Sequence, residues 1–186
     1  MQISIALIIV GSLLMLVAVG VPTYIISRYA KRIAPALTRE GLASDFGGLL
    51  YLFVAGEVGY LITSLWQAGR MAGDLYVLMS TSSGALAGAA LAAVPSMLAV
   101  LLTAFLLWKI AVGRTPRAAA IAVILLWLSG PCVAAAQSWY MQMALDEWSM
   151  LRGFGWCFFW TIYLAAATRP ALIYGTARGR SIAAGR

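Results

Sequence analysis

The sequence contains no histidine, and only 10% of its 186 residues are charged. Without histidine, imidazole ligation of haem, most zinc and copper sites, and every imidazole-dependent catalytic triad are excluded. Soluble domains carry roughly 25% charged residues, whereas 63% of this chain is hydrophobic. A soluble fold of this length has too little interior to bury so much apolar surface, so we expect lipid to be its solvent.

Cysteine is nearly absent too, because only Cys132 and Cys157 occur and no CxxC pair is present. Two cysteines make no disulfide framework and give no metal-ligand spacing. They lie near the same end of consecutive predicted spans, so one alternative is a single disulfide with Cα atoms within about 6.8 Å. Two buried thiols are the default, since free cysteine packs as a small hydrophobe.

What the chain does contain is long apolar runs, and a helix of about 20 apolar residues crosses a hydrocarbon core of roughly 30 Å. We therefore predict an all-α integral membrane protein, a single domain formed by a bundle of about five transmembrane helices. Pro95 and Pro131 are expected to kink two of them. The predicted spans are 4–26, 48–68, 86–112, 118–137 and 153–173.

The charge is unevenly distributed along the chain, whose formal net charge is +7. If the N-terminus lies outside, eleven of the thirteen Lys and Arg residues fall in inner segments, and only Arg70 and Arg152 fall outside. Short cytoplasmic loops carry such an excess of basic residues. We therefore predict an N-out, C-in topology. Since topology explains the positive charge, we expect no nucleic-acid partner.

Short motifs mark the two ends of the last four spans. Residues 47–50 read GGLL, and the fifth span contains Trp160-Thr-Ile-Tyr163, followed six residues later by Arg169. The pattern resembles a bacterial inner-membrane family of unknown function with four transmembrane helices, a GGWL-like opening and a W-x-x-Y-x5-R ending. The resemblance covers about residues 47–174.

This resemblance implies a multi-pass protein of the bacterial inner (plasma) membrane, with residues 1–46 as an added helix and inner loop. It implies no biochemical activity, since the family's role is itself unassigned. The chain departs from the pattern at three positions. Leu49 replaces the tryptophan, Ala167 replaces a serine, and Pro170 follows the arginine.

Glu57 is the one acid within the second predicted span, close to its middle. Ionisable groups at such depth are costly, and they usually face the bundle interior or a water-filled cavity. Since no Lys or Arg is expected at that depth, we expect a protonated carboxyl group that donates a hydrogen bond. Tyr60 lies on the same helix within reach. The other candidate partners, all hydroxyls, are Ser96, Thr103, Ser129, Thr161 and Tyr163.

Small residues recur every four positions at the start of the third span, at Gly84, Gly88, Ala92 and Ser96. Such stripes let transmembrane helices pack closely, either within one chain or between subunits. At the inner face, Arg169, Arg178 and Arg180 are candidates for contact with anionic lipid or with a cytosolic partner.

Two functions remain in competition. The first is a structural or interaction subunit of a membrane assembly, which forms a homo-oligomer or joins a larger complex. The alternative is a small transporter, channel or sensor that uses Glu57. We expect no enzyme activity, no cofactor and no metal, because neither a paired carboxylate nor a metal-ligand motif is present.

Overall fold

The computed structural model describes residues 5–81, 86–141 and 147–185, and every regular element in these ranges is a helix. Four stretches among them are long and apolar enough to cross a membrane. They are Gly11–Arg32, Leu49–Val77, Ala93–Val112 and Pro116–Trp139. The predicted class, an all-α membrane protein, is confirmed, and the predicted count of about five spans is approximate.

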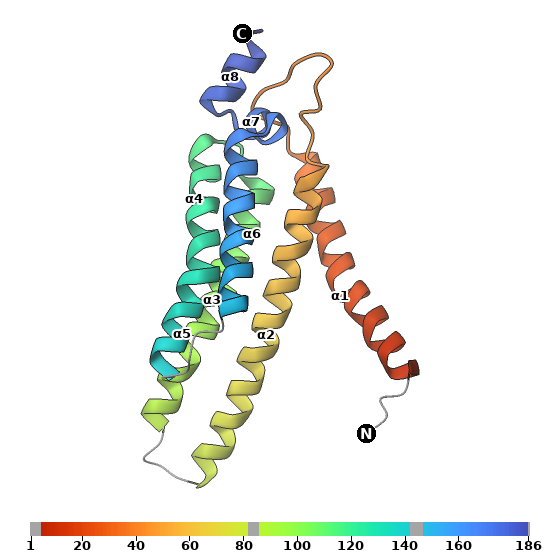
Figure 1. The fold of residues 1–186 in the computed structure, drawn as a ribbon. Helices are drawn as coiled ribbons and strands as arrows, with labels where there is room; N and C mark the ends of the chain where they lie inside the picture. Colours follow the sequence, from red (N-terminus) through yellow and green to blue (C-terminus); the bar gives the residue numbers. More distant parts are fainter. Residues whose placement is uncertain (1–4, 82–85, 142–146, 186) are drawn as a thin grey trace.

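The helices run up and down along one axis (Figure 1). Two short helices, α7 and α8, lie at one end of the bundle, which is the end opposite to the start of α1. The chain therefore runs along the length of the bundle an odd number of times (Figure 1). In chain order the elements are α1 (Ile5–Arg32), α2 (Leu49–Thr81), α3 (Leu86–Val112), α4 (Pro116–Trp127), the π-helical turn η2 (Leu128–Cys132), α5 (Val133–Met141), α6 (Glu147–Ala166), α7 (Thr168–Tyr174) and α8 (Ala177–Ala183).

Helix α1 stands apart from the others. It meets α2 and α3 near its C-terminal end and diverges from them toward its start (Figure 1). From Gly11 to Val21 its side chains are exposed, except that Val19 is half-buried. The remaining long helices pack on one another, with α4, η2 and α5 forming a continuous rod beside α3 and α6.

The fifth predicted span, 153–173, is not one helix. Helix α6 ends at Ala166, Ala167 is extended with ψ 144°, and α7 begins at Thr168. Pro170 accounts for the break, because a proline ring inside a continuous helix clashes with the carbonyl group four residues earlier. That carbonyl belongs to Ala166. In the first turn of a new helix, by contrast, the missing N–H group of proline has no consequence.

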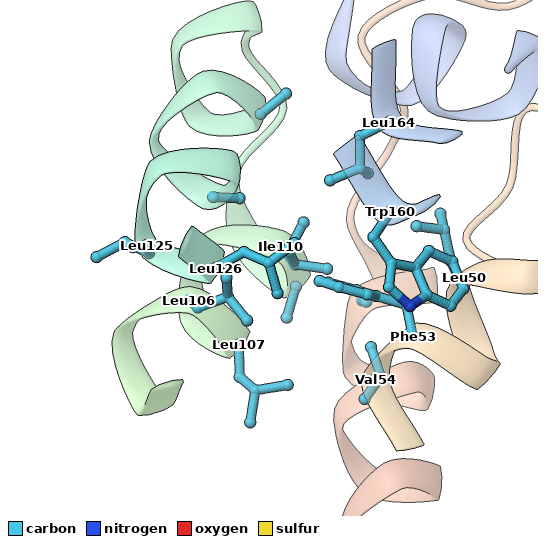
Figure 2. Close-up of a cluster of buried hydrophobic side chains, with 14 of the residues drawn as sticks. Leu50, Phe53, Val54, Leu106, Leu107, Ile110, Leu125, Leu126, Trp160 and Leu164 are labelled. Atoms are coloured by element: carbon cyan, nitrogen blue, oxygen red, sulfur yellow. The ribbon is translucent and has the colours of Figure 1, made fainter. Parts of the chain in front are cut away.

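The core is centred on Trp160 of α6, which is 2% exposed. Its ring lies 4.8 Å from that of Phe53 on α2, measured between centroids. Figure 2 shows side chains from α2, α3, α4 and α6 converging on the same layer, among them Leu50, Ile110 and Leu126. Burial of a large apolar side chain stabilises by about 1.5–3 kcal/mol, so this layer holds the four helices together.

The end of the bundle near α7 is closed by a cap, in which the loop between α1 and α2 meets α7. The backbone N–H groups of Ala36 and Leu37 donate to the carbonyl oxygens of Ile173 and Leu172, at 3.1 and 3.0 Å. The Tyr174 hydroxyl group, fully buried, donates to the Ile110 carbonyl oxygen at 3.0 Å. Burial raises the pKa of this phenol, which therefore remains a donor at neutral pH.

Basic residues gather at the same end. Lys31 and Arg32 lie in the last turn of α1, and Lys109 lies in the last turn of α3. Arg114 follows α3, and one of its Nη atoms donates to the Ala30 carbonyl oxygen at 2.6 Å. The cations assigned to inner segments by the charge pattern thus share one end of the bundle, apart from Arg186, which is outside the described residues (Figure 1).

Candidate functional site in the helix bundle

A partly open pocket of about 750 Å³ lies between α2, the α4–η2 rod and α6. This volume is within the roughly 300–1,000 Å³ typical of small-molecule sites. Its lining is mostly apolar, with a few polar groups on three elements. Helix α2 contributes Gly56, Glu57, Tyr60 and Thr63, the rod contributes Leu126, Ser129 and Gly130, and α6 contributes Arg152, Gly153, Trp156 and Cys157.

Glu57 is the buried polar centre of this pocket. It is the ninth residue of α2 and is 2% exposed. The indole Nε1–H of Trp156 donates to its Oε1 at 2.8 Å. The indole ring also crosses Gly56, where an added Cβ would lie 2.3 Å from the ring. Glycine at position 56 therefore gives the ring its access to the carboxyl group.

The π-helical turn η2 presents a backbone carbonyl group to the same pocket. The Val133 N–H donates to the carbonyl oxygens of Leu128 and Gly130, on either side of Ser129 in the turn. The Tyr60 hydroxyl group donates to that Ser129 oxygen at 2.7 Å. Pro131, which lacks an N–H group, lies inside the turn. The predicted disturbance at Pro131 is thus a π-helical turn.

Two further hydrogen bonds join α6 to α4, and a third lies within α6. The Trp127 indole N–H donates to the Thr161 hydroxyl oxygen at 3.0 Å, and the Thr161 hydroxyl donates to the Cys157 carbonyl oxygen at 2.7 Å. The buried Cys157 thiol donates to the Leu126 carbonyl oxygen, with 3.6 Å between the sulfur and oxygen atoms. Cys132 is exposed, and both cysteines are free thiols. The predicted alternative of a disulfide is therefore not what the structure contains.

The hydroxyl groups predicted to serve Glu57 are mostly used elsewhere. Ser96 donates to the Met71 sulfur at 3.3 Å. The Thr103 hydroxyl oxygen is buried without a hydrogen-bond partner among the described residues. Tyr163 stacks edge-on against Trp160. Only Tyr60 and Ser129 of the predicted set line the pocket with Glu57.

Trp156, the residue bonded to Glu57, was missed because only hydroxyl groups were considered as partners. An indole N–H is a donor and nothing else, so it suits a carboxyl oxygen as well as a hydroxyl group does. The signal was available in the sequence, since Trp156 precedes the motif residue Trp160 by four positions and so shares its face of α6.

Arg152 is the second residue that sequence reasoning missed. The charge pattern placed it in an outer loop, yet it lies in α6, one turn before Trp156, and lines the pocket that contains Glu57. Its Nε–H donates to the Trp148 carbonyl oxygen on the same helix at 3.3 Å. A guanidinium group and a carboxyl group thus share one pocket.

The stripe of small residues is described only in part. Gly84 lies outside the described residues. Gly88 and Ala92 lie in α3, and their side-chain surroundings are outside what the structure describes. Ser96 is buried where α3 faces α2.

The ends of the motif that suggested a family meet at the basic end of the bundle. The Arg169 guanidinium group lies over Gly47 and Gly48, and it approaches the Asp45 carboxylate at 3.8 Å. Gly48 has φ +61°, and a Cβ there would lie 2.5 Å from the Arg169 Nη1 atom. Two other predicted contact residues, Arg178 and Arg180 on α8, are exposed, and an Arg180 Nη atom donates to the Gly175 carbonyl oxygen.

The fold and the pocket define an all-α protein of the membrane-spanning class, with a polar pocket between its helices. Comparison with known proteins found no matching family model, curated protein or solved structure. The resemblance to a four-helix bacterial family therefore stays a prediction, carried by its motif residues.

Proposed function

We propose that this chain is a multi-pass protein of the bacterial inner membrane that binds a small polar ligand at Glu57, as a transporter or sensor does. The observation that carries the proposal is the pocket of about 750 Å³ with a buried carboxyl group in its wall. Intramembrane carboxyl groups that face a cavity typically mark a ligand or ion path. In the proposed topology, α6 is the fifth crossing and the basic end faces the cytoplasm.

The proposed role is binding, without catalysis. The residues that line the pocket include one carboxyl group and no second carboxyl group or imidazole. The polar groups there are already oriented, because Trp156 holds the carboxyl group and Tyr60 holds the η2 carbonyl group. Preorganised polar groups in a mostly apolar pocket give a ligand its orientation and specificity.

The test is a thermal-shift screen of small polar compounds against the full chain in nanodiscs. The wild type is compared with Glu57→Gln, whose amide oxygen still accepts a bond from Trp156 but bears no charge. The matched control is Thr103→Val, which removes a buried hydroxyl group that does not line the pocket. We expect compounds that raise Tm in the wild type and the control, and not in Glu57→Gln. Equal shifts in all three proteins, or no shift in any, would overturn the proposal.

A second candidate is a structural or interaction subunit that assembles with itself or with a larger membrane complex. The specific observation in its favour is α1, whose apolar side chains are exposed along the part that diverges from the bundle. Cross-linking tests it, with Leu16→Cys on α1 in a chain that has both native cysteines replaced by serine. Ile124→Cys, exposed on α4, is the matched control. Cross-linked products from Leu16→Cys alone support assembly through α1, and their absence in membranes contradicts it.

A further inference from the structure

A carboxyl group and a guanidinium group line the pocket without pairing with each other. Glu57 accepts its described hydrogen bond from Trp156, and Arg152 directs its Nε–H to the Trp148 carbonyl oxygen. No ion pair joins them in the part of the chain that the structure describes, where Arg169–Asp45 is the pair within 4.0 Å. Both groups therefore remain available to a ligand in the pocket.

The two groups are separated along the bundle axis. Arg152 lies four residues before Trp156 on α6, so its Cα is about 6 Å farther from the basic end than the Cα of Trp156, whose indole bonds Glu57. Side chains on a helix lean toward its N-terminus. Since α2 and α6 run in opposite directions (Figure 1), Glu57 leans toward the basic end and Arg152 leans away from it. A ligand that meets both groups must carry its own charges at opposite ends.

The intervening wall suits an aliphatic or otherwise apolar connection between those charges. Leu126 and the backbone of Gly130 and Gly153 line it beside the polar groups. The aromatic rings of Trp156 and Tyr60 stand next to Glu57 in the lining, and such rings attract an ammonium group through their π faces. The deep end of the pocket thus favours a cation, and the Arg152 end favours an anion.

We propose that the pocket binds an extended zwitterion, with a primary ammonium group at Glu57 and a carboxylate or phosphate group at Arg152. This inference rests on the proposed function of the pocket and names its ligand class. The order of the charges favours a soluble molecule over a lipid. An aminophospholipid in the nearer leaflet holds its ammonium group at the surface and its phosphate deeper, whereas Arg152 lies one turn nearer to the start of α6 than Trp156, the residue that bonds Glu57.

The probe is 6-aminohexanoate, which carries an ammonium and a carboxylate group at the ends of a short apolar chain. Two derivatives each remove one charge, the N-acetyl form and the methyl ester. Binding is measured by calorimetry on the full chain in nanodiscs, for the wild type, Glu57→Gln and Arg152→Gln. Arg70→Gln is the matched control, because Arg70 is exposed on α2 and does not line the pocket.

We expect the wild type and the control to bind 6-aminohexanoate more tightly than either derivative by about tenfold or more, as loss of a charge-assisted hydrogen bond predicts. Glu57→Gln is expected to lose the preference over the N-acetyl form only. Arg152→Gln is expected to lose the preference over the methyl ester only. Glycine, whose charges are adjacent, is expected to bind more weakly than 6-aminohexanoate.

Other outcomes overturn the inference in distinguishable ways. If binding depends on Glu57 and not on Arg152, the ligand is a simple cation, and the proposed function stands without the zwitterion. If phosphatidylethanolamine copurifies with the wild type and is lost from both variants, the same chemistry belongs to a lipid headgroup, and the soluble source is wrong. If no compound of the wider screen binds in a Glu57-dependent way, the proposed function itself fails.

Discussion

The hydrogen bond between Trp156 and Glu57 predicts a strong energetic coupling between α2 and α6. Trp156→Phe removes the indole N–H and leaves the buried carboxyl group without its described partner. An unsatisfied buried polar group costs about 1–3 kcal/mol, so we expect the free energy of unfolding to fall by that amount. Glu57→Leu alone leaves the indole N–H unpaired, and its cost has the same origin.

The double variant provides the test. Replacing both partners of a buried hydrogen bond by apolar groups is nearly neutral, so Trp156→Phe together with Glu57→Leu should cost less than the sum of the two single changes. Hydrogen bonds between transmembrane helices give couplings averaging about 0.6 kcal/mol, with a maximum near about 1.7 kcal/mol. We expect a value in the upper half of that range, because Glu57 is 2% exposed.

Unfolding is followed by helical circular dichroism as sodium dodecyl sulfate is added to detergent micelles. Trp108→Phe is the matched control, since this tryptophan on α3 is 59% exposed. The change in the free energy of unfolding caused by Trp108→Phe should be the same with and without Glu57→Leu. If the Trp156 and Glu57 changes add to within about 0.3–0.5 kcal/mol, the limit expected for independent sites, the two side chains are not coupled and the reasoning is wrong.

Three further predictions concern single contacts. Tyr60→Phe removes the hydrogen bond to the Ser129 carbonyl oxygen of η2 and should lower the free energy of unfolding by about 1 kcal/mol in the same assay. Gly48→Ala should cost about 1–2 kcal/mol from its left-handed backbone and more from displacing Arg169, so it should exceed Gly41→Ala, which has φ +77° and nothing within 4 Å. Burial raises the pKa of Tyr174, so its contribution to stability is complete below pH about 10 and declines at higher pH, and Tyr174→Phe should remove that decline in unfolding curves measured from pH 8 to 11.

The class and the long helices were predictable from the sequence because apolar length alone determines them. The predicted range 86–112 lies within α3, and the predicted range 48–68 lies within α2 except for Gly48. Helix α2 continues to Thr81, beyond the predicted end at residue 68. Arg70 and Asp74 end the apolar run, but they do not end the helix. Polarity limits the part of a helix that lies in lipid, whereas backbone hydrogen bonding continues beyond it.

The candidate site was predictable only in part. Glu57 stood out as the acid in an apolar span, and Tyr60 followed from its place one turn away on the same helix. The sequence places Trp156 on the same face of α6 as Trp160, but its contact with Glu57 and the position of Arg152 depend on the rotation and axial position of α6 relative to α2, which one sequence does not specify. The η2 carbonyl group was beyond prediction for another reason, since Pro131 indicates a disturbed helix without indicating a π-helical turn.

The cap at the basic end joins residues that are synthesised at very different times. The N–H groups of Ala36 and Leu37 emerge early, but their acceptors on Leu172 and Ile173 belong to nearly the last part of the chain. The guanidinium group of Arg39 likewise bonds to the Ile182 carbonyl oxygen on α8. Contacts so distant in sequence form late in folding. A chain cut short before α7 therefore lacks the acceptors of these N–H groups, and only a chain that extends through α7 closes the first loop.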